Sequence, residues 1–293
     1  SDHFRSQNGH SFRVKYKKAG EKFGNRKFNY INPRSRDFNS DFLLNLIYNK
    51  LYDGIRIHYK PVEVYLNKNR FGIMLEESFF DKYLIETNSR RESVIFEFTE
   101  DGQIHFNYID NKNESDYSGY ILDLYRNDYE AFLNKIDLNK LKSVIILGLI
   151  SNNAHPFSTI NLHWYYNPVS DLIEPTIRES FTTSLKNYNI EAVLNEIIEN
   201  NPIIKDLFLD SKNIFFRDLN NNLTEIENII NYDSEYLEFK QKMIGFSDKI
   251  NEREMLLKYN ISALKKQSFK KEINKKSQRI EITKDTLFKG EVI

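Results

Sequence analysis

The sequence contains no cysteine, which excludes disulfide bonds, thiolate zinc sites and cysteine nucleophiles. It has no net charge, because 42 basic residues balance 42 acidic ones, so no overall field attracts nucleic acid or an anionic membrane. No apolar run approaches the roughly 20 residues that a membrane span needs. A glycine-rich Walker loop and the motifs HExxH and GxSxG are missing, so a hydrolase has little support. The lack of cysteine does not by itself indicate a cellular compartment.

What is present is a chain of 293 residues, enough for one large or two modest domains with a sizeable core. It opens at Ser1 inside a polar segment, without Met or a signal sequence. We therefore expect it to be an excised piece of a longer protein.

Residues 11–18, SFRVKYKK, alternate between apolar and cationic side chains, which predicts a half-buried strand with Arg13 and Lys15 on one face. Either this face is simply solvated, or one of the two cations contacts ATP phosphates, as a strand lysine does in kinases. A short strand over residues 28–33 and a helix that Asn39 or Ser40 can cap should follow.

Two further hairpins are expected before the middle of the chain. Strand formers at 60–67 and 71–76 flank a turn at 67–70. Residues 94–98 and 103–108 flank Asp101-Gly102, and an Asn, Asp and Glu rich loop continues to residue 120. We expect this second hairpin and its loop to be a variable insertion.

Helical patterns dominate the rest of the chain. Residues 127–133 and 138–150 read as helices, and the second is apolar nearly all round, which is typical of a buried core helix. Two helices ending at 200–202 and further helices over 224–265 should follow. The basic run at 265–276 is better explained as a solvated helix end than as a nucleic-acid tail at balanced charge.

The stretch from His155 to Glu179 holds the most informative pattern. Strand-like runs at 162–167 and 172–177 flank a proline-containing turn at 168–171, which predicts a hairpin. The two outer ends of a hairpin lie close together. The amide oxygen of Asn161 and the carboxylate of Glu179 could therefore share one cation.

Two blocks of the chain carry a resemblance to a known family. The first is GIMLEESFFDKYLIETNSRRE, which starts at Gly72, and the second is NLHWYYNPVSDLIEP, which starts at Asn161. Together with SFRVK they resemble the CotH-like (spore coat protein H type) kinase family of atypical protein kinases. The resemblance covers roughly residues 2–180. It implies an α+β fold with a small β-rich N-lobe, incomplete at its N-terminus, and a larger helical C-lobe.

The resemblance also implies site residues. Asn161 and Glu179 would hold the Mg²⁺ or Mn²⁺ of bound ATP, although the family has Asp at the second position. Arg13 or Lys15 would contact phosphate. Asp41, where the family has Glu, would pair with that cation, the alternative being a solvent-facing acid at the helix N-terminus.

A hinge that meets the adenine base is implied at Glu77 and Ser78, with Glu76 or Glu77 contacting the ribose or a partner cation. A surface acidic pair is the alternative. For the general base the nearest candidates are Asn153 and His155, and the pKa range of histidine suits that role. A lone His before proline is, without the family, more often structural. Arg90 and Arg91 would pair with Glu86 or Glu97, or bind phosphate.

The implied domains are a partial N-lobe over 1–77, a C-lobe over 78–250, and a basic helix with the start of a strand-rich segment over 251–293. The implied activity is phosphoryl transfer from ATP to a hydroxyl group on a protein or surface polymer, with Ser as the expected acceptor. Cell-surface or extracellular location is implied by the family alone. Because three expected positions depart from the family pattern, a degenerate pseudokinase that serves as a binding or scaffolding module stays open.

Overall fold

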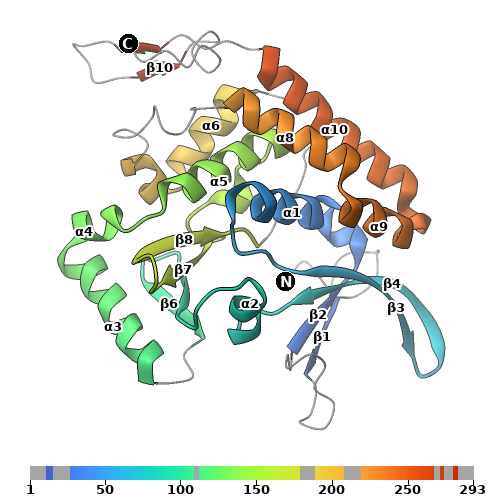
Figure 1. Cartoon of the computed structure of the whole chain (residues 1–293), viewed down its shortest axis with the longest axis horizontal. Helices are drawn as coiled ribbons and strands as arrows, with labels where there is room; N and C mark the ends of the chain where they lie inside the picture. The colour runs from blue at the N-terminus through green and yellow to red at the C-terminus, as the bar shows by residue number, and fades with distance from the viewer. Residues whose placement is uncertain are drawn as a thin grey trace.

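The computed structural model describes residues 11–15, 27–108, 112–178, 189–207, 219–266, 271–273 and 280–282. The fold is α+β, as expected. Two four-stranded antiparallel sheets are joined by helices that fill the rest of the described chain (Figure 1).

The first sheet has the strand order β1-β2-β4-β3, and the second has the order β6-β5-β7-β8. The strands of the first sheet are β1 (Phe12–Lys15), β2 (Lys27–Ile31), β3 (Tyr59–Leu66) and β4 (Asn69–Ser78). Those of the second are β5 (Ile95–Phe98), β6 (Ile104–Tyr108), β7 (His163–Asn167) and β8 (Leu172–Thr176). A short two-stranded ladder joins β9 (Lys271–Ile273) to β10 (Ile280–Ile282) near the C-terminus.

The helices form most of the body around the second sheet. They are α1 (Ser40–Tyr52), α2 (Lys82–Thr87), α3 (Lys112–Asn127), α4 (Tyr129–Asn134), α5 (Leu138–Ser151), α6 (Ile190–Glu199), α8 (Leu219–Tyr232), α9 (Ser234–Lys242) and α10 (Ser247–Lys266). In the described residues they are accompanied by the 3-10 turns η3 (Pro33–Arg36), η4 (His155–Phe157) and η6 (Ile244–Phe246). Within the described residues, none of these helices is long and apolar enough to cross a membrane.

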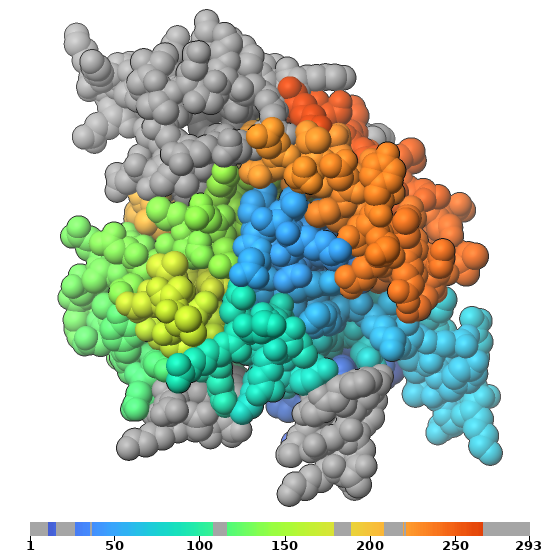
Figure 2. All heavy atoms as spheres, viewed as in Figure 1, coloured from blue at the N-terminus to red at the C-terminus, as the bar shows by residue number. Residues whose placement is uncertain are grey.

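The hairpin of β3 and β4 follows from its turn residues. Asn67 and Lys68 both have positive φ, 50° and 70°, the conformation of the two-residue turn whose twist matches antiparallel strands. Asn tolerates that conformation better than most side chains. The tip carries exposed Tyr65 and Leu66 and projects from the body of the molecule (Figure 2).

Helix α5 lies at the centre of the helical body, as its apolar sequence predicts. Its N-terminus is capped by Asp137, whose side chain accepts hydrogen bonds from two backbone N–H groups. It packs against α1, α6 and α10 (Figure 1). Gly148 permits the contact with α6, because a Cβ there would lie 2.5 Å from Ile197 Cδ1. The buried helix is therefore the element on which the others assemble.

One cluster of buried side chains extends from Ile31 in β2 to Leu264 in α10 and includes both sheets. A second, smaller cluster of Phe28, Tyr30 and Met74 lies on the opposite face of the first sheet. The expected domain boundary at residue 77 falls within β4, and that at residue 250 falls within α10.

The segment expected to be an insertion with a polar loop is different in the structure. Strand β5 pairs with β7 and is buried, so the hairpin of β5 and β6 forms half of the second sheet. Most of the predicted loop belongs to helix α3. Its side chains Tyr117, Ile121 and Leu124 recur at helical spacing and pack against the core, which stabilises the helix despite its polar composition.

One smaller expectation is also corrected, and another falls largely outside the described residues. Asn39 occupies the N-cap position of α1, but its side chain makes no capping hydrogen bond and donates to Tyr236 Oη instead, at 2.6 Å. Of the basic run at 265–276, residues 267–270 and 274–276 lie outside the described residues.

Candidate functional site

The inner face of the first sheet, which points towards the main core, carries a row of polar side chains. Arg13, Asn29 and Glu77 are neighbours across β1, β2 and β4. Arg13 Nε donates to Asn29 Oδ1 at 2.8 Å, and Asn29 Nδ2 donates to Glu77 Oε1 at 2.6 Å. Tyr59 of β3 lies opposite Glu77 and completes the row. The candidate phosphate-binding cation and the candidate hinge acid are thus connected through one asparagine.

Cations gather at the β1 edge of this face. Lys15 lies directly opposite Lys27, and both share a face with Arg13 because side chains alternate along a strand. Neither Arg13 nor Lys15 forms an ion pair with a carboxylate in the described part of the chain. Arg13 Cζ and Lys27 Nζ both lie over the ring of Phe79, 4.7 and 4.9 Å from its centroid. We call Arg13, Lys15 and Lys27 the cation cluster.

The two glutamates predicted as hinge candidates point to opposite faces of β4. Glu77 is 1% exposed, and its Oε2 has no hydrogen-bond partner among the described residues. Glu76 is 7% exposed and accepts a hydrogen bond from Tyr30 Oη at 2.8 Å, on the outer face. The alternative of a surface acidic pair is therefore wrong, since both residues are buried. Only Glu77 faces the cation cluster.

The environment of Asp41 differs from both of the environments predicted for it. It is fully buried, so it is not a solvent-facing acid at the helix N-terminus. The predicted pairing with the strand cation is also absent, because Arg13 is held by Asn29 and Lys15 forms no ion pair with Asp41. The side chain of Asp41 projects from the first turn of α1 into the protein interior.

Phe79 and Phe80, which follow β4 directly, connect the cation cluster to the hairpin of β7 and β8. The ring of Phe80 stacks on His163 at 4.2 Å between centroids, and Arg178 Cζ lies 5.8 Å from the same ring. Tyr59 Oη donates to the backbone oxygen of Arg178 at 3.0 Å. The segment that leaves β8 therefore contacts the inner face of the first sheet.

His163 is held neutral at this junction. Burial, followed by the charge of Arg178, lowers the pKa of His163 to about 3. The contact of 3.1 Å between His163 Nε2 and Glu97 Oε2 is consequently not an ion pair at neutral pH.

Asn153, His155 and Asn161 lie together at the start of this hairpin. Asn153 Oδ1 accepts a hydrogen bond from the backbone N–H of His155 at 3.1 Å. Asn161 Nδ2 donates to the backbone oxygen of His155 at 2.7 Å, while Asn161 Oδ1 accepts no hydrogen bond from a described residue. His155 is exposed. Glu179 lies outside the described residues, directly after Arg178.

The predicted hairpin itself is confirmed, with His163 opposite Thr176. The residues before β7 and the residues after β8 leave the hairpin at the same end. The first segment includes Asn161, and the second is described up to Arg178. That end faces the first sheet through the contact with Tyr59.

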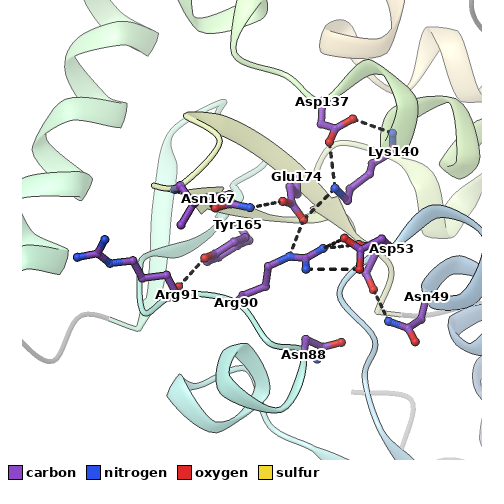
Figure 3. Close-up of polar contacts among 12 residues, drawn as sticks. Asn49, Asp53, Asn88, Arg90, Arg91, Asp137, Lys140, Tyr165, Asn167 and Glu174 are labelled. Atoms are coloured by element: carbon purple, nitrogen blue, oxygen red, sulfur yellow. Dashed lines mark hydrogen bonds and ion pairs between the residues drawn. The ribbon is translucent and has the colours of Figure 1, made fainter.

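The two sequence blocks that carry the family resemblance are joined by a buried ionic network (Figure 3). Arg90 Nε and Lys140 Nζ lie 3.3 and 3.4 Å from Glu174 Oε2. Asn167 Nδ2 donates to Glu174 Oε1 at 2.7 Å, and Glu174 is 1% exposed. The predicted partners of Arg90, Glu86 and Glu97, are therefore wrong; it pairs with Glu174 and Asp53, as Figure 3 shows.

The sequence places Glu174 in the block that starts at Asn161 and Lys140 in the helix predicted at 138–150, but it assigns neither residue a role. Their separation along the chain hides the contact, although a charged residue in a buried strand was a signal that a partner must exist.

No protein-family model matches the chain, and a search of curated proteins gives no match either.

Proposed function

We propose that this chain is a two-lobed, kinase-like protein that binds ATP with Mg²⁺ or Mn²⁺ and transfers phosphate to a hydroxyl of a protein or surface polymer. The first sheet would belong to the small lobe, and the second sheet with its helices to the larger one. The observation that carries the proposal is the cation cluster on the inner face of the first sheet.

Without a ligand, the cation cluster destabilises the folded protein. Like charges directly opposite each other on neighbouring strands are destabilising, and Lys15 and Lys27 form such a pair. Departures from local stability rules concentrate at functional sites. A chain of phosphates would bring negative charge to these cations, and phosphoryl transfer depends mainly on positioning and neutralising that charge. A polyphosphate ligand therefore explains why these cations share one face.

The metal ligands of the proposal are Asn161 and Glu179. Both supply oxygen atoms, which suit hard divalent cations such as Mg²⁺ and Mn²⁺. Asn161 fits this role because its amide nitrogen is fixed by His155, leaving Oδ1 as the free donor atom. A bound cation there would neutralise phosphate charge. The contact of Arg178 with Tyr59 supports the idea that the end of β8 adjoins the first sheet.

His155 is our candidate for the group that orients or deprotonates the acceptor hydroxyl. It is exposed, and its backbone oxygen accepts a hydrogen bond from the side-chain amide of Asn161. Asn153 is a less suitable base, since its side-chain oxygen already accepts the N–H of His155 and an amide does not titrate in the physiological range.

Thermal unfolding with and without ATP and Mg²⁺ tests nucleotide binding. A ligand that binds only the folded state at 100 times its Kd stabilises by about 2.7 kcal/mol. We expect a clear rise in Tm for the wild type and a smaller one for Arg13→Gln. Arg70→Gln, at the projecting hairpin, is the matched control and should respond like the wild type. No shift at millimolar ATP would remove nucleotide binding from the account.

A nucleotide-binding module without catalysis is the second candidate. The burial of Asp41 in the protein interior favours it, because the family pattern places at this position the acid that would fix the phosphate-binding cation. Transfer of labelled γ-phosphate separates the two. A kinase transfers label and loses transfer in Glu179→Ala, whereas a binding module shows the thermal shift alone.

A further inference from the structure

An arginine lies where the end of the second sheet meets the first sheet. Arg178 follows β8 by two residues and is half-buried. Its backbone oxygen accepts a hydrogen bond from Tyr59 Oη, and Tyr59 belongs to the row of polar side chains on the inner face of the first sheet. Its guanidinium carbon lies 5.8 Å from the centroid of the Phe80 ring. The side chain is therefore held at the junction of the two sheets.

The guanidinium of Arg178 has no anionic partner in the described structure. It forms neither an ion pair nor a hydrogen bond with a described residue, and its Nε is buried without an acceptor. Glu97, which contacts the neighbouring His163, does not pair with it. Buried donors in native proteins are nearly always hydrogen-bonded, so this Nε points to a ligand or an ordered water. The two terminal nitrogens are not among the buried unpartnered atoms, so a ligand can reach them.

Arg178 and the cation cluster are placed on adjacent aromatic rings. Phe79 directly precedes Phe80, and its ring carries Arg13 and Lys27 at 4.7 and 4.9 Å. An aromatic ring attracts a cation but has no net charge, so it does not neutralise one. The junction therefore gathers positive charge from both sheets.

We infer that Arg178 binds the phosphate chain of the nucleotide from the side of the second sheet, an inference that rests on the function proposed above. The planar guanidinium offers paired donors that match phosphate oxygens. Glu179, proposed as a metal ligand, follows directly in the sequence. An acidic group of the acceptor is the alternative anion. The hydrogen bond with Tyr59 favours the nucleotide, because the row that contains Tyr59 leads to Arg13.

Calorimetric titration with two probes, ATP and inorganic tripolyphosphate, each with Mg²⁺, tests this inference. We expect Arg178→Gln to weaken the binding of both probes by about tenfold or more, the loss typical of a hydrogen bond to a charged group. Arg178→Lys keeps the charge but lacks the paired donors, so it should recover part of the loss. Without ligand, the Tm of Arg178→Gln should stay close to that of the wild type, because the guanidinium has no acceptor in the described structure.

Arg126→Gln is the matched control. It removes an exposed arginine without an ion pair in the described structure from the last turn of α3, which lies at one edge of the molecule (Figure 1). Exposed charges that are far apart are screened by salt, so binding of both probes should stay within about twofold of the wild type.

The outcomes separate this inference from the proposed function. Equal binding in Arg178→Gln and Arg126→Gln would overturn the inference, leave the nucleotide site in place and point to an acidic acceptor as the partner of Arg178. If the wild type binds tripolyphosphate but not ATP, and Arg178→Gln abolishes that binding, Arg178 binds phosphate and the nucleotide proposal is wrong. A wild type that binds neither probe would overturn both.

Discussion

The two sheets have the same number of strands and the same antiparallel pairing, but they differ in whether their charged side chains have partners of opposite charge. In the second sheet the buried Glu174 meets two cations and an amide, and Arg90 and Lys140 each have a further carboxylate, Asp53 and Asp137. In the first sheet Arg13 and Lys15 have no carboxylate partner in the described structure, and Glu77 Oε2 is unpartnered. The saturated network indicates a structural role, whereas the groups of the first sheet that lack such partners fit the ligand site proposed above.

The largest effect expected at neutral pH comes from Glu174→Gln. The change leaves Arg90 and Lys140 without their shared carboxylate in a buried site. Breaking a buried pair costs 3–5 kcal/mol, and we expect about 3 kcal/mol because Asp53 and Asp137 remain. Urea unfolding measures the loss.

Glu238→Gln is its control, because it removes an exposed pair with Lys242 on α9 and should leave the unfolding midpoint unchanged. A Glu174→Gln protein as stable as that control would mean that the network does not stabilise the second sheet.

The next effect is a pH dependence at the junction of the sheets. The pKa of His163 is about 3 in the folded chain, below its ordinary 6.5. Between these two pH values the unfolded chain therefore binds a proton at His163 that the folded chain does not bind. The stability present above pH 6.5 is therefore lost as the pH falls towards 3, by about 1.4 kcal/mol per pH unit. Urea unfolding at several pH values measures this slope.

His163→Phe keeps a ring to stack on Phe80 and should remove that part of the slope. His155→Gln, which removes an exposed imidazole, is the matched control for the loss of one histidine. If His163→Phe and the wild type lose stability equally between pH 6 and 4, the pKa of His163 is not lowered.

The smallest effect has the opposite sign and concerns the free first sheet. Lys15→Gln removes the repulsion with Lys27, so we expect the free energy of unfolding to stay the same or rise by about 0.5 kcal/mol without ligand. Lys68→Gln at the hairpin tip is the control for the loss of one positive charge. A clear loss of stability in Lys15→Gln alone would show that Lys15 has a structural partner and would weaken the comparison.

The sequence predicts correctly those elements that are determined by residues adjacent in the chain. The buried helix α5 and the turns at Asn67 and Pro168 are of this kind, and all three predictions are confirmed. Helix α3 was missed because its polar composition outweighed a stripe of apolar side chains that includes Tyr117 and Ile121.

The candidate site was harder to predict. Alternation along β4 could have separated Glu76 from Glu77 at once, since adjacent strand residues face opposite sides. The burial of Asp41 and the pairing of Arg90 with Glu174 depend on contacts between distant segments, which no local pattern contains. The place of Asn153 beside His155 was, by contrast, within reach of sequence reasoning.

The central claim is that a metal-bound nucleotide lies between the cation cluster and Asn161. NMR with ATP and Mn²⁺ tests it most directly, because the paramagnetic ion broadens the signals of nearby groups. We predict that the side-chain amide of Asn161 and the backbone signals of Lys15 and Lys27 broaden, while those of Lys68 at the hairpin tip and Asn167 at the far end of β7 stay sharp. Sharp signals at Asn161 and Lys27 with saturating ATP and Mn²⁺ would contradict the account.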